Sequence, residues 1–372
     1  MTIVKESAPH LRRKASVTRM MVDVLIALFP TLIWAFVAFP LQSLGILLVS
    51  MFCMHACEFA YVGLRNMMPK DGLKHSFKER FVFAYKGKYK LSNFLTCTIS
   101  AVIFTLILPP GAPLYAAAIG SIVGITFGKL VFGGLGSNIF NPAAVGMVFA
   151  KLCFGDQYGV MSAWYYNIPD AAAGATPLAH MNGGALSNIS QYPLLDLFLG
   201  NVPGTLGEVF KITILLGLAY LLIRRSADYR IVVSYLGTFI ALMFIAGLVV
   251  HGKNGSVNPF EFTAYALLSG GVLFGATFML TDPVTSPINP PSRYIYGMVA
   301  AVITVFIRLF AALPEGVGFS ILIANMIAVF LDHSEWSSSR YTWKKFLAMG
   351  LIFVLAGLTV FLCLQFGGIY HA

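Results

Sequence analysis

Residues 22–39, VDVLIALFPTLIWAFVAF, form an apolar run that ends just before Pro40. At about 1.5 Å per residue, an α-helix of this length approaches the roughly 30 Å thickness of the hydrocarbon core of a bilayer. The run therefore predicts a membrane-spanning helix. Ten further apolar runs follow along the chain, at about 43–64, 92–109, 113–133, 139–154, 207–223, 231–250, 263–281, 294–313, 317–331 and 346–366.

The composition agrees with a chain that crosses a membrane many times. Of the 372 residues, 58% are hydrophobic and 11% are charged, a balance that soluble proteins of this size do not have. The formal net charge is +10, but the basic residues are segregated by loop, which fits membrane topology and excludes a nucleic-acid-binding face. The first 19 residues are polar and basic, so no cleavable signal peptide is expected.

The basic residues also predict the orientation of the chain. They gather at the N-terminus, in the loop at 65–90, in the link with Arg224, Arg225 and Arg230, and in the link with Arg340, Lys344 and Lys345. Because basic loops stay in the cytoplasm, all of these lie inside if the N-terminus does. The 155–206 loop follows the fifth span, and no Lys or Arg occurs between Lys151 and Lys211. We therefore expect that loop outside, together with the C-terminus.

A faint internal repeat divides the predicted helices into two halves. Residues 115–130 can be aligned with residues 294–309, which matches Lys129 with Arg308. The matched spans are five apart, and an odd offset reverses their direction across the membrane. We therefore expect an all-α polytopic membrane protein. Its ten-helix core at 1–333 would consist of two inverted five-helix repeats, followed at 334–372 by a cytoplasmic link and one additional span.

One stretch of the 155–206 loop, DAAAGATPL at 170–178, presents a threonine. The small residues before Thr176 leave its backbone accessible to a bulky partner. Pro177 fixes the chain just after the hydroxyl and keeps Thr176 out of a helical conformation. The pattern indicates a threonine presented for modification. A capped turn between a loop and a short helix is the alternative.

This stretch resembles the flavinylation motif of a family of membrane subunits. The family contains RnfD, from the Rnf complex, which is an ion-translocating ferredoxin:NAD oxidoreductase, and the B-type subunit of the sodium-pumping NADH:quinone reductase. Its motif reads Asp-Gly-x-Ser/Thr-Gly-Ala-Thr, and the last threonine carries FMN through a phosphoester bond. The positions that match are Asp170, Gly174, Ala175 and Thr176, and those that depart are Ala171 and Ala173. The resemblance implies covalent FMN at Thr176.

A second motif stands at the predicted start of the fifth span, where Asn138 and Asn141 precede Pro142. Asparagines at such positions cap a helix, and capping alone is the simpler interpretation. The Asn-x-x-Asn-Pro pattern is also similar to a segment that lines a non-covalent riboflavin in the quinone-reductase subunit. On that resemblance, Asn138 and Asn141 would contact a second flavin, riboflavin or FMN, near the cytoplasmic face.

Several charged residues stand in or beside the apolar runs. Glu58 lies either on an ion path or next to a basic partner, and Lys129 and Arg308 have the same two interpretations. We expect Lys129 to reach the interface by snorkelling, Asp282 to cap the turn that follows it, and Glu315 to be a solvated charge. The five cysteines lie in apolar segments and lack the converging ligands that a metal or iron–sulfur site needs.

The resemblance extends from about residue 8 to residue 333, and its N-terminal part is closer to RnfD. It implies a subunit of a redox-driven pump in the bacterial inner membrane, which passes electrons between ferredoxin and NAD and moves sodium or protons. Little activity is expected of the subunit alone. The implied partners are other Rnf subunits, including flavin and iron–sulfur subunits, and a flavin transferase. The alternatives are a quinone-reductase subunit, an inverted-repeat transporter without a redox centre, and a structural assembly subunit.

Overall fold

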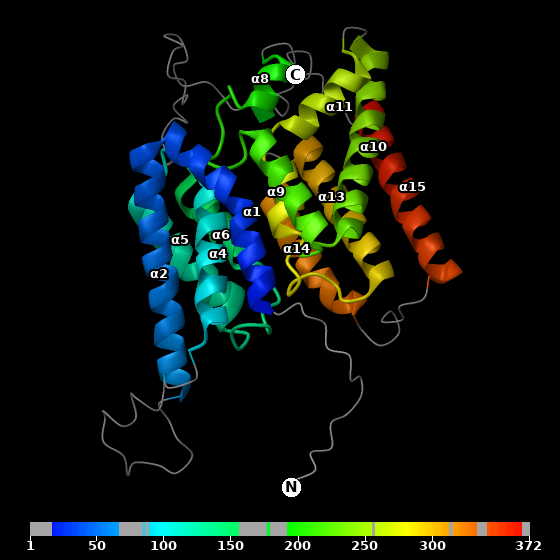
Figure 1. Ribbon diagram of the computed structural model, residues 1–372. Coiled ribbons are helices and arrows are strands. Elements are labelled where there is room, and N and C mark those ends of the chain that lie inside the picture. Colours follow the sequence, from blue (N-terminus) through cyan, green and yellow to red (C-terminus); the bar gives the residue numbers. More distant parts are fainter. Residues whose placement is uncertain are drawn as a thin grey trace.

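The computed structural model describes residues 17–66, 85, 89–155, 177–178, 192–254, 257–311, 315–332 and 341–366, and within them the chain is a helical bundle without β-strands (Figure 1). In chain order the helices are α1 (Val17–Ala38), α2 (Pro40–Asn66), α4 (Leu91–Ile107), α5 (Leu114–Ile125) with the π-helix η1 (Thr126–Leu130), α6 (Pro142–Phe154), α8 (Leu194–Leu199), α9 (Lys211–Arg224), α10 (Tyr229–Asn254), α11 (Pro259–Leu268), α12 (Val272–Phe274) with the π-helix η4 (Gly275–Met279), α13 (Pro290–Phe310), α14 (Val317–Leu331) and α15 (Trp343–Phe366). Each predicted apolar run coincides with a helix or with a linked group of helices, which confirms the all-α class.

The lengths of these helices indicate a multi-pass membrane protein. In the described part of the chain, α1, α2, α10, α13 and α15 are each long and apolar enough to cross a membrane, and the bent segment from α11 to η4 passes the same test as a pair. The shorter apolar helices are α4, α5 with η1, α6 and α14. Large apolar side chains such as Leu41, Phe52 and Leu64 are more than two-thirds exposed on the outside of the bundle, where lipid would cover them.

The bundle has two ends that differ in charge. We call the end at which α1 begins the basic end, because Arg65, Arg224, Arg225 and Arg230 lie there, at the bottom of Figure 1. The helices α4 and α6 run from the basic end to the other end, which we call the far end (Figure 1). The connection from α6 to α9 therefore starts at the far end, on the side away from these arginines, as the count of spans predicted.

The helices α5 and α6 touch through a row of small residues. A Cβ atom on Gly124 would lie 2.6 Å from the carbonyl oxygen of Pro142, and one on Gly146 would lie 2.7 Å from the carbonyl oxygen of Gly120. Small residues let membrane helices approach closely where van der Waals packing drives their association. Gly128 continues the row, since its Cβ would lie 2.6 Å from the Cα of Pro142. This contact holds the π-helix η1 directly against the start of α6.

The close approach of α5 to α6 predicts that Gly124→Ala destabilises the protein. The new methyl group would meet backbone atoms that cannot rotate away, so we expect a loss of about 1–3 kcal/mol, as for other overpacked interiors. Thermal melting of the purified chain in detergent measures the loss. Gly237→Ala in α10 is the matched control, because a Cβ there has open space, and an equal melting temperature for the two variants would contradict the prediction.

The eighth predicted span, at 263–281, is broken rather than continuous. The two parts, α11 and α12 with η4, meet at an angle of 62°. Gly270 lies between them at φ +63°, a left-handed conformation that suits glycine. The sixth span also begins later than predicted, at Lys211 rather than at residue 207, because residues 207–210 are irregular. In this irregular segment the amide of Gly207 donates to the carbonyl of Leu106 in α4 at 2.7 Å.

The two inverted repeats stay a prediction that the described residues accommodate. Lys129 and Arg308, which the alignment matches, lie at opposite ends of the bundle, as an inverted repeat requires. The last helix, α15, packs against α10 and α13 at one edge of the bundle (Figure 1). This edge position is the one expected of a helix added to a core.

Candidate functional sites at the two ends of the bundle

The two residues that follow the motif predicted to carry FMN pack into the far end of the bundle. Outside the residues that the structure describes lie Asp170, Gly174, Ala175 and Thr176. The next two residues, Pro177 and Leu178, are buried at the far end. The Tyr265 hydroxyl in α11 donates to the carbonyl of Pro177 at 3.2 Å, and Leu178 is 3% exposed. The modification of Thr176 stays a prediction, but the chain directly after it is anchored to the broken helix.

A small cavity of about 60 Å³ lies beside Pro177 and Leu178. The charged residues in its wall are Lys151, Glu208, Lys211 and Glu315. Two of their carboxylates converge on the backbone between α11 and α12. A Cβ atom on Gly271 would lie 2.6 Å from Oε2 of Glu208 and 3.1 Å from Oε1 of Glu315. A side chain at position 271 would therefore displace both carboxylates.

The surroundings shift the pKa values of the two carboxylates in opposite directions. Burial, followed by the charge of Glu315, raises the pKa of Glu208 to about 8. Burial also disfavours ionisation of Glu315, but Lys151 at 3.5 Å, together with Glu208 and Arg308, holds the pKa of Glu315 below its usual value. The side chain of Glu315 is 16% exposed, so the prediction of a solvated charge was wrong.

Two buried cations hold the break in the eighth span. Arg308 in α13 donates to the carbonyls of Ala266 at 2.7 Å and Ser269 at 3.1 Å. Lys211, the first residue of α9, donates to the carbonyls of Gly270, at 3.1 Å, and of Glu208. The carbonyls at a helix C-terminus have no partner within the helix, and these cations supply one. The sequence-based prediction overlooked Glu208 and Lys211; the signal was an acid and a base three residues apart beside an apolar run.

A larger cavity of about 320 Å³ opens at the basic end. Its wall is mostly apolar and comes from α1, α4, η1, α6, α9, η4 and the segment after η4. The polar residues that line it include Thr96, Lys129, Asn138, Asn141, Thr281 and Asp282. The structure thus brings both predicted asparagines into the wall of one cavity, whose volume is at the lower end of the range of about 300–1,000 Å³ typical of small-molecule sites.

Asn141 caps α6 and also bridges to the second half of the bundle. Its Oδ1 accepts hydrogen bonds from the amides of Ala143 at 3.0 Å and Ala144 at 3.4 Å, and Pro142 occupies the first helical position. Its Nδ2 donates to the carbonyl of Met279, the last residue of η4, at 3.4 Å. The capping interpretation is confirmed, and the amide still has one N–H to offer.

The other two predicted polar residues of this wall are held differently. Asn138 donates to the carbonyl of Phe140 at 3.4 Å, which is a weak contact, and is 8% exposed. Asp282 accepts from the amide of Val284 and the hydroxyl of Thr285, both at 3.2 Å, so it caps the turn as predicted. Burial raises the pKa of Asp282. Of the two residues, Asn138 is the one that can offer an N–H to a ligand, since an ionised carboxylate only accepts.

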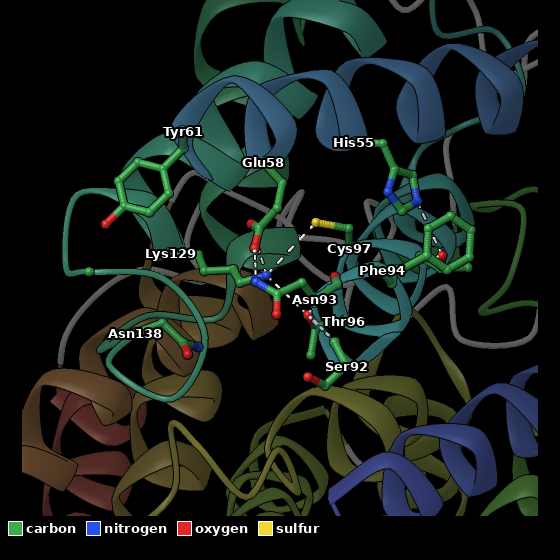
Figure 2. A network of polar contacts seen from close by, with 12 residues as sticks. His55, Glu58, Tyr61, Ser92, Asn93, Phe94, Thr96, Cys97, Lys129 and Asn138 are labelled. Carbon is green, nitrogen blue, oxygen red and sulfur yellow. Dashed lines mark hydrogen bonds and ion pairs between the residues drawn. The ribbon is translucent and has the colours of Figure 1, made fainter. Parts of the chain in front are cut away.

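Behind the same wall, Lys129 and Glu58 form a buried ion pair (Figure 2). Their side chains are 3% and 1% exposed, and Nζ of Lys129 lies 3.0 Å from Oε2 of Glu58. Figure 2 shows the ammonium between α2 and α4, where Asn93 donates to Glu58 at 3.0 Å. The snorkelling predicted for Lys129 was therefore wrong, because the π-helix η1 turns this residue inward to a carboxylate. Of the two interpretations of Glu58, the one with a basic partner is confirmed, and a place on an ion path stays a prediction.

The chain is similar to known membrane subunits over most of its length. The family model described as the NQR2, RnfD, RnfE family matches residues 4–339. The B-type subunit of the Na(+)-translocating NADH-quinone reductase of Chromohalobacter salexigens is 37% identical over 238 residues, which are 63% of this chain and 57% of that protein. The corresponding subunit of Klebsiella pneumoniae (strain 342) is 35% identical over 261 residues, which are 68% of this chain and 61% of that protein. The chain thus spans less than two-thirds of the length of these relatives.

Proposed function

Because the chain belongs to the NQR2, RnfD, RnfE family, we propose that it is a flavin-bearing membrane subunit of a redox-driven sodium or proton pump. One observation carries the proposal. The anchored segment after Thr176 and the cavity lined by Asn138 and Asn141 lie at opposite ends of one bundle. Flavins at these two places would let electrons cross the membrane within a single chain.

The far-end flavin would be FMN, joined to Thr176 by a phosphoester that a flavin transferase forms. Asp170, Gly174 and Ala175 complete the motif that such an enzyme would recognise. Pro177 and Leu178 support this assignment, because they fix the chain next to the break between α11 and α12. Thr176 itself would be an anchor that keeps the flavin from leaving.

The cavity at the basic end suits a flavin ring by the chemistry of its wall. A flavin ring has an apolar edge and an edge rich in carbonyl and ring-nitrogen acceptors. The wall offers apolar side chains from α1 and α4 and the donors Lys129, Asn138 and Asn141. Such a flavin, riboflavin or FMN, would exchange one or two electrons with its partners. The residues of this chain would bind the ring, orient it and keep water from it.

The electron donor and acceptor have two candidate identities. The motifs near the N-terminus favour an Rnf-type protein that serves ferredoxin and NAD, with Rnf flavin and iron–sulfur subunits as partners. The curated relatives, named as subunits of Na(+)-translocating NADH-quinone reductases, favour the quinone-reductase type. Assays of membranes that contain the complete complex, with reduced ferredoxin and NAD or with NADH and a quinone, distinguish the two. In both cases the basic end would face the cytoplasm of a bacterial inner membrane.

The test of the proposal is flavin attachment. The chain, purified from cells that contain its transferase and denatured, should fluoresce in a gel under ultraviolet light. A transporter without a redox centre or an assembly subunit would show no such band. Absence of the band in material from an active native complex would refute the far-end flavin.

Asn141 variants separate capping from flavin binding. Asn141→Asp keeps a side-chain acceptor for the amides of Ala143 and Ala144 but removes the N–H donor. Because it also loses the hydrogen bond to the carbonyl of Met279, we expect it to lower the melting temperature slightly, and to weaken riboflavin binding by about tenfold, the effect of one lost hydrogen bond of about 1.4 kcal/mol. Asn141→Ala should lose both the bound flavin and about 1 kcal/mol of stability from the cap. Extractable flavin and melting temperature measure the two effects, and unchanged flavin in both variants would contradict the contact.

A further inference from the structure

The position of Lys129 sets it apart from the other donors of the basic-end cavity. Among the described residues that line this cavity, Lys129 is the one cation and Asp282 the one acid. The carboxylate of Asp282 is engaged by the turn at Val284 and Thr285. The positive charge of Lys129 acts strongly on a ligand in this cavity, since a buried charge acts through a medium of low dielectric constant.

The hydrogen bonds of Lys129 leave one strong donor free. An ammonium group has three N–H donors. The first faces an ion pair rather than a hydrogen bond, with Oε2 of Glu58 3.0 Å from Nζ, and the second donates to the hydroxyl of Thr96 at 3.0 Å. The third has only the sulfur of Cys97, at 3.8 Å, and a thiol is a weak acceptor. A carbonyl or ring nitrogen in the cavity would be a better partner for that N–H.

Glu58 stands behind the ammonium and offsets its charge. Its side chain is 1% exposed, and the described cavity lining includes Lys129 but not Glu58. A ligand in the cavity would therefore meet the cation first and the anion through it. Removing Lys129 would make the electrostatic potential at the cavity more negative, and removing Glu58 would make it more positive.

We propose that the Glu58–Lys129 pair sets the reduction potential of the molecule bound in the basic-end cavity. The inference rests on the proposed flavin at that site. Two electrons from an external reductant and one proton convert a neutral flavin ring to an anion. Lys129 binds that anion more tightly than the neutral ring, and Glu58 limits the difference. Lys129 thus contacts the ligand and sets its reduction potential. Glu58 is a positioning residue that acts through Lys129.

The experiment measures riboflavin binding to the full-length chain in detergent. Thr176→Ala serves as the background, so that no covalent FMN contributes to the absorbance. The reduction potential of bound riboflavin, titrated anaerobically with dithionite, gives the ratio of its affinities for the reduced and oxidised forms. We expect Lys129→Gln to lower this ratio at least tenfold and Glu58→Gln to raise it by a similar factor. A tenfold change equals about 30 mV for a two-electron couple.

Three further variants separate this role from a structural one. Lys129→Arg keeps the charge and should keep the ratio within about threefold. Lys345→Gln removes another buried lysine, on α15 at the edge of the bundle, and should leave the ratio unchanged. Lys129→Gln leaves the buried carboxylate of Glu58 without its cation. If that variant fails to fold for this reason, the Glu58→Gln/Lys129→Gln double variant replaces it. Its ratio should then lie at least tenfold below that of Glu58→Gln.

The possible outcomes decide the inference. Opposite shifts in the two single variants support it, because a loss of packing would shift both ratios in the same direction or in neither. Equal or absent shifts, with riboflavin bound, overturn the role of Lys129 and leave the flavin site standing. No riboflavin binding to the Thr176→Ala chain would overturn the flavin site and this inference together.

Discussion

Thr176→Ala is expected to abolish covalent flavin completely. The proposed phosphoester would join the threonine hydroxyl to the FMN phosphate, with a net loss of one water, and alanine offers no atom for such a bond. The denatured variant should show no fluorescent band, and its intact mass should equal that of the unmodified chain. The unaltered chain should be heavier by one FMN minus one water. The effect is all-or-none, because the rest of the molecule contributes nothing to the linkage itself.

Two controls assign that loss to the hydroxyl. Thr176→Ser keeps an oxygen at the same position and should retain part of the fluorescence. Thr359→Ala changes an exposed threonine whose hydroxyl only bonds to the carbonyl of Leu355 in α15, and it should label fully. Fluorescence that persists in Thr176→Ala would refute the anchor. A modified peptide that can be reached only from the cytoplasmic side would refute the predicted topology.

The sequence could predict the helices because a membrane helix must satisfy its own backbone hydrogen bonds. Long apolar runs therefore map almost one to one onto helices, from Val17–Ala38 to Trp343–Phe366. The break in the eighth span escaped prediction for the same reason. Its carbonyls at Ala266 and Ser269 are satisfied by Arg308, which is about 40 residues away in sequence. Local pattern carries no information on such a distant partner.

The candidate site was predictable to a similar extent. Asn138 and Asn141 stood out because an Asn-Pro pair marks a helix start, and both do line the cavity. The inward position of Lys129 was not predictable, because it depends on the π-helix η1 and on the contact of Gly128 with Pro142. A lysine near the end of an apolar run usually snorkels. Only the fold shows that Glu58 lies within 3.0 Å of it.

Arg308→Met is expected to destabilise the protein strongly. Arg308 is 2% exposed, bonds to the two carbonyls at the end of α11, and stacks over the ring of Phe239 at 5.4 Å. Methionine fills similar space but leaves both carbonyls without their donor. It also removes a cation from the cluster that contains Glu315. Breaking such a buried charged contact costs about 3–5 kcal/mol, so the melting temperature should fall by roughly 10 °C.

Arg293→Met provides the matched control on the same helix. Arg293 lies at the other end of α13, where it pairs with Asp228 and its side chain is 25% exposed. This pair keeps part of its solvation, and Arg293 also donates to the carbonyl of Pro287 at 2.8 Å, so the melting temperature should fall by clearly less than for Arg308→Met. Arg308→Lys should fall between the two, because lysine keeps the charge but lacks the fork that reaches two carbonyls. If Arg308→Met and Arg293→Met melted alike, the break between α11 and α12 would be held by packing alone. The anchoring of the segment after Thr176 would then not depend on the charge of Arg308.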